Sequence, residues 1–364
     1  MQPLRLRRAC ASLAMPQLQG VGFDQAAAQL RGRLMFAAWL LACLAIGLGG
    51  TWLARVYALR RGVVDAPGER RAHTTPTPRG GGISIVVALL LTGAWLLRGM
   101  PDRFELSCAL VGLILVAGVG LLDDHRPLSP WLRLAVQGVA ASLLAIGTWH
   151  ASGEPILAIG AFVLAMALTN IWNFMDGIDG IAATQALLCA LAIGFLHPGI
   201  WSWWAFALAA ATLGFLPFNF PKARIFLGDV GSGALGFVLA ALLIKTLEGT
   251  APTHAWLWAL PISAFVIDAA LTLARRILRG ERWWQPHAQH VYQQWARRTG
   301  SHAKITLIYG AWTLAAIVLM TMLGGQGHDP AWVSMVVLAW YTAGAGAWWM
   351  LQTERSAAVK ESTE

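Results

Sequence analysis

Charged residues are scarce in this chain of 364 residues: 12% are Asp, Glu, Lys or Arg, whereas 57% are hydrophobic. A typical soluble domain has about 25% charged residues, so an ordinary water-soluble protein is excluded. Cysteine is scarce as well, because the chain has only four, and they are scattered. Their positions give no CxxC pair or other zinc-ligand spacing. The composition indicates a membrane protein without a cysteine-based metal site.

Two patterns that bind nucleotides or nucleic acids are also missing. No Walker lysine pattern occurs, so the sequence does not support nucleotide hydrolysis by a P-loop. No basic face interleaves with aromatic residues, so the net charge of +9 does not indicate a nucleic-acid partner. Basic cytoplasmic loops and membrane lipids with anionic headgroups explain this charge more simply. The nineteen tryptophans, several of them paired near predicted helix ends, are typical of rings that anchor at a membrane interface.

Long apolar runs dominate what is present. Each is near the roughly twenty residues that a transmembrane helix requires. They cover residues 36–56, 81–98, 106–122, 131–149, 156–172, 181–197, 201–217, 231–247, 255–274, 304–324 and 331–351. We therefore expect an all-α polytopic membrane protein with about eleven transmembrane helices. The two runs beside Pro198 are interpreted as separate helices, and one broken helix is the alternative.

Basic residues gather in alternate loops, and this bias sets the orientation of the chain. The loops after the first, seventh and ninth predicted helices hold most of them: Arg60, Arg61, Arg70, Arg71, Arg79, Lys222, Arg224, Arg275, Arg276, Arg279, Arg282, Arg297 and Arg298. The positive-inside rule places these loops in the cytoplasm. Because successive loops alternate between the two sides, the loops with Asp123, Asp176, Asp229 and His287 face the cytoplasm too. We therefore expect a site at the cytoplasmic face.

The first residues contradict this orientation, because Arg5, Arg31 and other arginines precede a helix whose start should lie outside. We predict that residues 1–34 are a basic segment outside the native chain and that Met35 is the true start. Met1 and Met15 are the other candidate starts, and a basic surface arm is the alternative. Residues 35–352 are predicted to form the transmembrane domain, and residues 353–364 a polar cytoplasmic tail.

Asp123 and Asp124 end the third predicted helix. Adjacent carboxylates repel one another unless a cation or a proton lies between them. Magnesium is a natural partner, because it binds a few carboxylate or amide oxygens and completes its shell with water and substrate phosphate. A solvated helix end is the alternative interpretation of this pair taken alone.

Asn170, Asn173 and Asp176 recur at every third position and therefore share one face of a helix. Asp179 follows between two glycines, which let the backbone turn and bring this carboxylate close to a ligand. Polar groups at the end of an apolar span need partners. The pattern therefore indicates a binding site more than an accident of sequence.

Two further loops carry polar groups. The loop 218–233 is basic at first and returns to Asp229, which has glycines on both sides. His287 and His290 lie one helical turn apart in an arginine-rich loop. Such a loop is suited to binding a diphosphate through charge-assisted hydrogen bonds. An interfacial turn without a ligand is the alternative for the two histidines.

Six motifs in order resemble those of the polyprenyl-phosphate N-acetylhexosamine-1-phosphate transferases of glycosyltransferase family 4, over about residues 36–325. They are Asp65-x-Pro67-x-x-Arg70-x-x-His73, Thr77-Pro78-Arg79-x-Gly81-Gly82, Asp123-Asp124, Asn170-x-x-Asn173-x-x-Asp176-Gly-x-Asp179-Gly, Phe226-Leu227-Gly228-Asp229-x-Gly231-Ser232 and His287-x-x-His290. The resemblance implies a phosphoglycosyl transferase of the bacterial inner membrane. Such an enzyme transfers sugar-1-phosphate from a cytoplasmic UDP-N-acetylhexosamine to undecaprenyl phosphate and releases UMP. The lipid product starts a surface polysaccharide.

The resemblance also implies residue roles. Asp229 and Asn173 are the expected ligands of Mg²⁺, for which Mn²⁺ can substitute. The expected catalytic residues are Asp123, Asp124 and Asp176, with Asp123 as the candidate base toward the acceptor. The expected nucleotide-sugar contacts are Asn170, Asp179, Asn219, Arg133, His287 and His290. Arg70, His73 and Arg79 belong to further motifs without an assigned role.

Arg79 favours one branch of this family. The sequence Thr77-Pro78-Arg79 resembles the enzymes that initiate O-antigen, enterobacterial common antigen or teichoic acid, whereas the peptidoglycan branch typically has Met at this position. The histidine loop is more similar to WbpL-type enzymes with a His-Ala-Tyr-Gln element, which leaves the donor sugar open. A phospho-N-acetylmuramoyl-pentapeptide transferase and a secondary transporter are the alternatives. Membrane lipids are expected partners, nucleic acid is not, and a homodimer is left open.

Overall fold

The computed structural model describes residues 23–65, 75–197, 199–248, 250, 252–282, 284–285, 287–324 and 327–361. The chain divides into two units, Met1–Trp39 and Leu40–Glu364. In the first unit, the described residues belong to the beginning of helix α1 (Phe23–Arg61), so Met35 lies within a helix. The second unit holds the remainder of α1 and all the other elements.

Nearly all the described residues of the second unit are helical. The helices are α1 (Phe23–Arg61), α2 (Ile83–Leu96), α3 (Phe104–His125), α4 (Pro130–Ser152), α5 (Pro155–Phe174), α6 (Ile181–Leu196), α7 (Ile200–Asn219), α8 (Gly228–Leu247), α9 (Pro252–Ala255), the 3₁₀ helix η1 (Trp256–Ala259), α10 (Ser263–Leu278), α11 (Val291–Thr299), α12 (His302–Gly324) and α13 (Pro330–Glu361). Among the described residues, seven helices are long and apolar enough to cross a membrane. The all-α polytopic class is confirmed, whereas the count of eleven spans is not. The prediction of two helices beside Pro198 is confirmed by α6 and α7.

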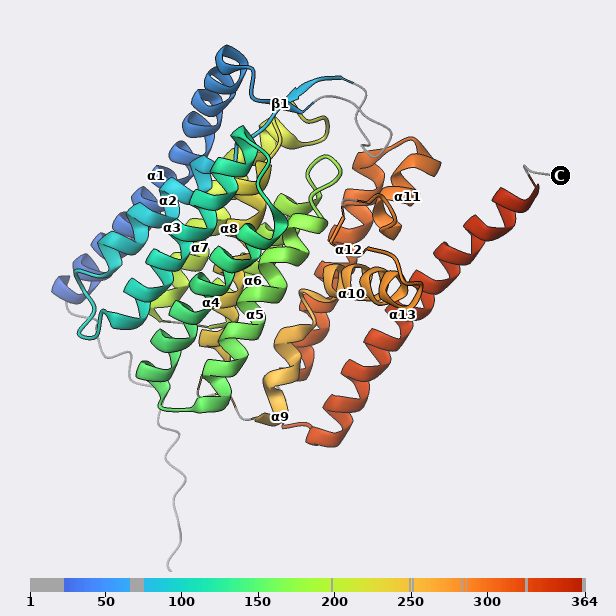
Figure 1. The fold of residues 1–364 in the computed structure, drawn as a ribbon. Helices are drawn as coiled ribbons and strands as arrows, with labels where there is room; N and C mark the ends of the chain where they lie inside the picture. Colours follow the sequence, from blue (N-terminus) through green and yellow to red (C-terminus); the bar gives the residue numbers. More distant parts are fainter. Residues whose placement is uncertain are drawn as a thin grey trace, which may run out of the picture. The chain divides into compact units, whose positions relative to one another are not determined.

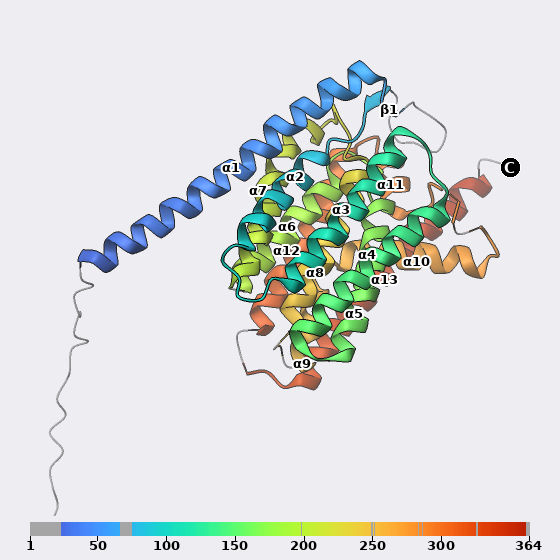
Figure 2. The ribbon, with the colours of Figure 1, turned by 60° about the vertical axis from the view of Figure 1, so that its left-hand side comes forward.

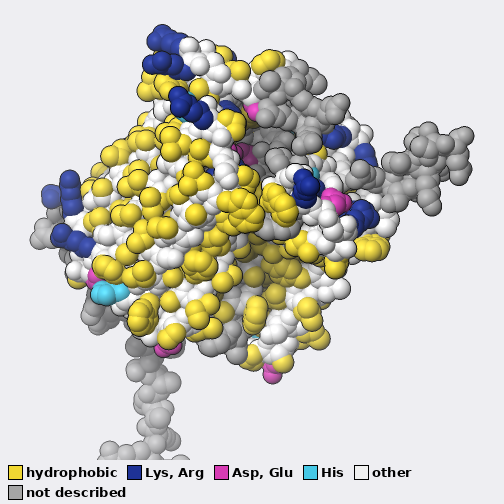
Figure 3. Space-filling view, in the orientation of Figure 1, with side chains coloured by type: hydrophobic (Ala, Val, Ile, Leu, Met, Phe, Trp, Pro, Cys, Tyr) yellow, Lys and Arg dark blue, Asp and Glu magenta, His cyan; other side chains and the backbone are white. Residues whose placement is uncertain are grey.

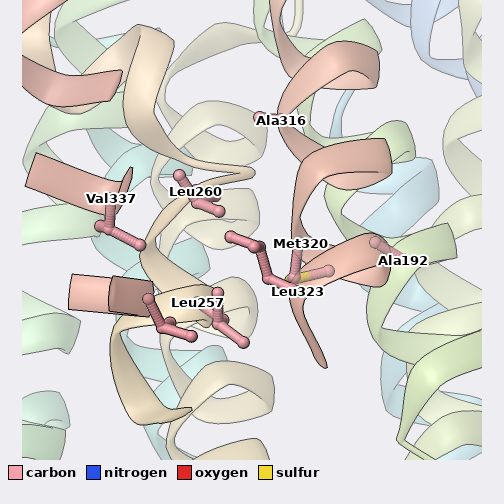
Figure 4. Packing of buried hydrophobic residues seen from close by; sticks show 8 residues of the cluster. Ala192, Leu257, Leu260, Ala316, Met320, Leu323 and Val337 are labelled. Atoms are coloured by element: carbon pink, nitrogen blue, oxygen red, sulfur yellow. The ribbon is translucent and has the colours of Figure 1, made fainter. Parts of the chain in front are cut away.

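The ninth predicted span, residues 255–274, is wrong as a continuous helix. The chain forms α9 and η1, turns at residues 260–262, and continues as α10 from Ser263. Pro261 contributes to the break, because proline has no backbone N–H with which to continue the helical hydrogen bonds. Leu257 and Leu260 of this broken segment pack against α12 and α13 in the apolar cluster of Figure 4. After the break, α10 runs across the direction of the bundle helices, as Figures 1 and 2 show.

Helix α8 forms the centre of the bundle. Figures 1 and 2 both show it among α3, α4, α5 and α6, and it packs most extensively against α3 and α5. Gly236 permits the close approach to α5, because a Cβ atom there would lie 2.1 Å from the carbonyl oxygen of Leu168. The position of α8 puts Asp229, in its first turn, in the middle of one end of the bundle.

Two short strands close part of this end. β1 (Val64–Asp65) pairs antiparallel with β2 (Thr77–Pro78). The β2 segment then contacts the loop before α8, because the N–H of Phe226 donates to the carbonyl oxygen of Pro78 at 2.8 Å and the N–H of Gly81 donates to that of Phe226 at 2.9 Å. Two motifs that are distant in the sequence are therefore joined by backbone hydrogen bonds.

Apolar side chains cover the outer faces of the bundle helices. Ile114, Val139, Ile156 and Ile159 are large hydrophobic residues that are about half exposed or more. Figure 3 shows hydrophobic side chains across this face, with Lys and Arg at its margins. In water such a surface would be unfavourable. This distribution is the one expected for helices that contact lipid.

Candidate active site

The predicted polar clusters meet in one cavity of about 370 Å³ at the end of the bundle where α3 and α5 finish and α8 begins. Eight of the predicted site residues line it: Arg79, Asp124, Arg133, Asn173, Asp176, Asp229, His287 and His290. The expectation that these clusters share one side of the protein therefore agrees with the structure. Arg70 and His73 lie outside the described residues.

Arg133, in the first turn of α4, joins two of the predicted carboxylates. Its Nη1 donates to Oδ2 of Asp123 at 2.9 Å and to Oδ2 of Asp229 at 2.6 Å. The other oxygen of Asp123 accepts the backbone N–H of Leu128 at 2.7 Å. Asp123 does not line the cavity itself but lies behind Arg133, whereas Asp229 and Arg133 are each more than a quarter exposed. The centre of the site is therefore a cation held between two acids.

Asp124 holds the beginning of α8. Its two carboxylate oxygens accept the backbone N–H groups of Asp229 at 3.0 Å and of Val230 at 3.2 Å. The first N–H groups of a helix have no partner within the helix, and a carboxylate there also interacts favourably with the helix dipole. Asp124 is 2% exposed. In this structure it orients Asp229 from behind.

Arg79 performs the corresponding function at the end of α3. Its Nη2 donates to the carbonyl oxygen of Asp124 at 2.6 Å and to that of Asp123 at 3.3 Å. A cation is favourable at the carbonyl end of a helix, where the dipole is negative. Arg79 also lines the cavity. It therefore fixes the Asp pair and adds positive charge to the wall.

The two asparagines of α5 lie in different surroundings. The amide nitrogen of Asn173 donates to Oδ1 of Asp229 at 3.0 Å and to Oγ of Ser232 at 3.1 Å, which leaves its amide oxygen for a ligand. Asn170 donates to the side chain of Gln137 at 3.0 Å. Asn170 faces a neighbouring pocket and is not among the residues that line the cavity. The helix face that the sequence predicted therefore borders two adjoining spaces: Asn170 lines the neighbouring pocket, and Asn173 lines the cavity.

Asp176 follows the end of α5 and lines the cavity. Burial raises the pKa of this carboxyl well above its ordinary value, and the negative charges of Asp229 and Asp124 act in the same direction. A carboxyl with a raised pKa keeps its proton to a higher pH and can donate a hydrogen bond to an oxyanion. The neighbouring acid Asp229 is bound by Arg133.

Two predicted nucleotide contacts are placed away from the cavity. Asn219 is 2% exposed, and its amide group accepts the N–H of Gly180 and donates to the carbonyl oxygen of Ile225, both at 3.0 Å. Asp179 lies 3.2 Å from Nδ1 of His302 at the start of α12. Neither lines the cavity. In this structure both residues support the loop between α5 and α6, and their nucleotide roles stay predictions.

The two histidines form one wall of the cavity. Their rings stack with centroids 4.9 Å apart and an interplanar angle of 29°. Burial lowers the pKa of His287 to about 4, and the charges of His290 and Arg276 contribute to this. His287 is therefore neutral near pH 7 and can bind a phosphate by hydrogen bonding only. Tyr292, which sequence reasoning missed, also lines the cavity and donates from its hydroxyl to the carbonyl oxygen of Phe174 at 2.9 Å.

An apolar groove adjoins the polar cavity. Val116, Val119 and Leu134 form part of its wall, and Trp131 and Trp284 lie at its edge with ring centroids 6.3 Å apart. The groove and the cavity share the central residues Arg133, Asn173 and Asp229. A ligand with an apolar chain and an anionic head could therefore reach Arg133 from this side. The paired tryptophans in the sequence indicated a membrane interface, but they did not predict this groove.

The donor atoms at the centre suit a hard divalent cation. Among the described residues, no group of three or more His, Cys, Asp or Glu side chains is arranged to hold a metal ion. Magnesium does not need such a cage, because it binds through one or two carboxylates together with water and phosphate oxygens. Asp123 and Asp229 already hold the positive charge of Arg133 between them. The carboxylate of Asp229 and the amide oxygen of Asn173 are the donor types that fit magnesium bound together with a phosphate ligand.

Comparison with known proteins agrees with this chemistry. Glycosyl transferase family 4 matches residues 106–247. A decaprenyl-phosphate N-acetylglucosaminephosphotransferase of Mycobacterium tuberculosis (strain ATCC 25618 / H37Rv) is 34% identical over 304 residues, which cover 71% of this chain and 75% of the relative. The protein of that name from Mycobacterium leprae is 32% identical over 306 residues, 72% and 77% of the two chains. An undecaprenyl-phosphate alpha-N-acetylglucosaminyl 1-phosphate transferase of Yersinia pestis is 28% identical over 316 residues, 79% and 84% of the two chains.

The family match covers the part of the chain that builds the centre of the site. Residues 106–247 include the ends of α3 and α5 and the beginnings of α4 and α8, which supply Asp123, Arg133, Asn173 and Asp229. The resemblance that was carried by six sequence motifs is thus confirmed by the comparisons and is consistent with the geometry of the site. The chain belongs to glycosyl transferase family 4, the polyprenyl-phosphate N-acetylhexosamine-1-phosphate transferases, and is a multi-pass membrane phosphoglycosyl transferase.

Proposed function

We propose that this protein transfers N-acetylhexosamine-1-phosphate from a UDP-sugar to undecaprenyl phosphate. An oxygen of the lipid phosphate attacks the phosphorus that bears the sugar, the bond between this phosphorus and the bridging oxygen breaks, and UMP leaves. N-acetylglucosamine is the first candidate sugar, because the relatives are named for it. The observation that carries the proposal is the place of Arg133 between Asp123 and Asp229, where the polar cavity meets the apolar groove.

The two sides of the site suit the two substrates. The apolar groove is the proposed site for the beginning of the polyprenyl chain, which would bring the lipid phosphate to Arg133. The wall with His287 and His290 is the proposed site for the donor diphosphate. Both substrates are anionic, so the reaction needs positive charge between them. Arg133 and Arg79 supply part of this charge.

Proton abstraction is a minor part of this proposal. A phosphate monoester is already mostly ionised near pH 7, so the acceptor does not need a strong base. Both carboxylate oxygens of Asp123 are occupied by hydrogen bonds from Leu128 and Arg133. These contacts favour a role for Asp123 in positioning Arg133 and the acceptor phosphate. Effective positioning can account for a large part of a rate enhancement.

We propose Mg²⁺ as the cofactor, with Mn²⁺ as a substitute. Asp229 and Asn173 are the proposed ligands, together with oxygens of the donor diphosphate. When bound, the metal would neutralise charge that develops on the phosphate oxygens. The chain's own part is to present the carboxylate of Asp229, which Asp124 orients from the backbone side and Arg133 from the cavity side.

The finer biological assignment is also a proposal. The positive-inside bias of the basic loops supports a site at the cytoplasmic face of the bacterial inner membrane, where a soluble nucleotide and a lipid phosphate can meet. The Thr77-Pro78-Arg79 motif favours initiation of an O-antigen type of surface polysaccharide over peptidoglycan synthesis. In the structure, Thr77 and Pro78 form β2, and Arg79 donates a hydrogen bond to the end of α3.

A panel of labelled donors tests this proposal. Purified protein is incubated with undecaprenyl phosphate, Mg²⁺ and one of several donors: UDP-N-acetylglucosamine, UDP-N-acetylgalactosamine, a UDP-N-acetyl-deoxyhexosamine or UDP-N-acetylmuramoyl-pentapeptide. The product is then extracted into organic solvent. Label in the solvent with an N-acetylhexosamine donor supports the proposal. Label with the pentapeptide donor alone would move the protein to the peptidoglycan branch.

A further inference from the structure

The histidine wall is attached to α10 by one buried carboxylate, Asp268. This residue is 1% exposed. Its Oδ1 accepts the backbone N–H of Val291 and its Oδ2 that of Tyr292, both at 3.0 Å. These are the first two residues of α11, whose N–H groups have no partner within that helix. Asp268 therefore holds the start of α11, next to His290, from a neighbouring helix.

Three side chains complete the surroundings of this carboxylate. The hydroxyl of Tyr309 donates to Oδ2 at 2.8 Å and that of Thr272 donates to Oδ1 at 3.1 Å. His290 places its Nδ1 3.6 Å from Oδ1 of Asp268. This separation is too long for a hydrogen bond, but it directs one edge of the ring toward the negative charge. A buried carboxylate needs such partners to remain ionised.

The ring of His290 has little freedom to turn. It is 3% exposed, and it stacks on His287 and, with centroids 6.4 Å apart, on Phe174. Because Nδ1 is buried on the side of Asp268, Nε2 is the ring nitrogen left for the cavity that His290 lines. An Nε2–H group that faces the cavity can donate a hydrogen bond to an oxyanion of a bound ligand.

We propose that Asp268 is a positioning residue of the transfer reaction, which directs Nε2 of His290 toward the donor diphosphate by holding the start of α11 and the Nδ1 edge of the ring. The inference rests on the proposed function, because that proposal makes the donor diphosphate the ligand of His290. Sequence reasoning missed Asp268 because it placed this residue inside a continuous span, residues 255–274. The break at Pro261 instead starts a separate helix, α10, in which Asp268 contacts the start of α11 directly after the histidine loop.

A double-mutant cycle tests whether Asp268 acts through His290. The variants are Asp268→Asn, His290→Ala and the two combined, with UDP-N-acetylglucosamine and undecaprenyl phosphate varied in turn. Each single change should lower kcat/KM for the donor by about tenfold or more, with the acceptor KM unchanged. The effects of substituting residues that act in one network do not add independently. In the His290→Ala background, Asp268→Asn should therefore lower the donor efficiency by less than about twofold.

Ser263→Ala is a matched control on the same helix. Ser263 is completely buried and accepts hydrogen bonds from the indole nitrogens of Trp312 at 3.0 Å and Trp340 at 2.9 Å. It is the first residue of α10, and Asp268 lies further along the same helix. We expect Ser263→Ala to lower the unfolding temperature while the donor efficiency stays within about twofold. Tyr309→Phe is the mild variant should Asp268→Asn not fold, and it should lower the donor efficiency about two- to fivefold.

Three outcomes would overturn the inference in distinguishable ways. If the losses of the two single variants multiply in the double variant, Asp268 acts independently of His290. If Asp268→Asn weakens donor and acceptor use equally and lowers stability as Ser263→Ala does, the carboxylate only maintains the fold. If His290→Ala itself leaves the donor efficiency unchanged, the proposed role of the histidine wall fails along with this inference. Transfer activity with the donor panel would still test the proposed function separately.

Discussion

At the scale of single residues, the site works through charges that are shared between elements. Arg133 lies 10 positions from Asp123 and 96 from Asp229 in the sequence, yet it bonds to both. No periodicity could have predicted this bridge, because it depends on how α4 packs beside α3 and α8. The motifs did predict that Asp123 and Asp229 belong to one site. The family resemblance named Arg133 as a nucleotide-sugar contact, but it did not predict that Arg133 joins these two acids.

Asp229→Asn should lower turnover by about 10² or more, because the change is nearly isosteric and removes the charge shared by Arg133 and the proposed metal. Turnover is measured across a magnesium titration after treatment with EDTA, with folding checked by thermal unfolding. Asp102→Asn is the control, since Asp102 is exposed and pairs with the exposed His150. Near-normal turnover of a well-folded Asp229→Asn protein would remove Asp229 from the reaction.

His287 should make stability depend on pH. Its pKa falls from an ordinary 6.5 to about 4 on folding, mainly through burial. Between these values the unfolded chain binds a proton that the folded chain does not, so stability decreases as the pH falls from 6.5 to 4. His287→Gln should flatten this part of the profile of unfolding temperature against pH. Identical profiles for the two proteins would show that His287 is not buried as described.

At the scale of elements, the site is assembled from helix ends. Asp124 holds the start of α8, Arg79 holds the end of α3, and Asp268 holds the start of α11. Each contact joins two different elements, which are distant in the sequence for Asp124 and consecutive helices for Asp268. The hydropathy pattern located most of these helices, because each has a long apolar run. It could not predict the contacts between their ends, nor that both amide atoms of Asn219 are used inside the protein.

Asp124→Asn should destabilise the protein by about 1 to 3 kcal/mol, because an amide has one acceptor oxygen and leaves one buried N–H of α8 without a partner. Asp329→Asn is the matched control. Asp329 also accepts two N–H groups at a helix start, from Ala331 and Trp332, but both go to its Oδ1 and the contact is exposed, so an amide oxygen can keep them. Denaturant or thermal unfolding compares the two changes, and Asp329→Asn should lose little stability. Equal losses would contradict the argument that Asp124→Asn leaves a buried N–H of α8 without an acceptor.

At the scale of the whole molecule, one end of the bundle gathers all the polar motifs that the structure describes. The sequence predicted this from loop parity, and the cavity agrees with it. The count of spans was harder to predict, because the break at Pro261 and the short helices α2 and α6 do not follow a simple rule of length. Hydropathy records how apolar a segment is, but it does not record where the segment turns.

Single cysteines should report this sidedness. Ser129→Cys, Lys222→Cys and Arg279→Cys lie in loops or at helix ends beside the basic segments, and Glu154→Cys lies in the loop between α4 and α5 at the other end of these helices. In a background without the native cysteines, the first three should react only from the cytoplasmic side, and Glu154→Cys should react with an impermeant reagent on intact cells. The reverse pattern of labelling would show that the chain has the opposite orientation in the membrane.

The fate of the donor's β-phosphate tests the central claim most directly. UDP-N-acetylglucosamine, or the best sugar from the donor panel, is labelled with one isotope in the sugar and another in the β-phosphate, and is incubated with the purified protein, Mg²⁺ and undecaprenyl phosphate. We predict that both labels enter the organic phase in equal amounts and that one UMP is released for each lipid product. A lipid product that carries the sugar without the β-phosphate, with release of UDP, would contradict transfer of sugar-1-phosphate.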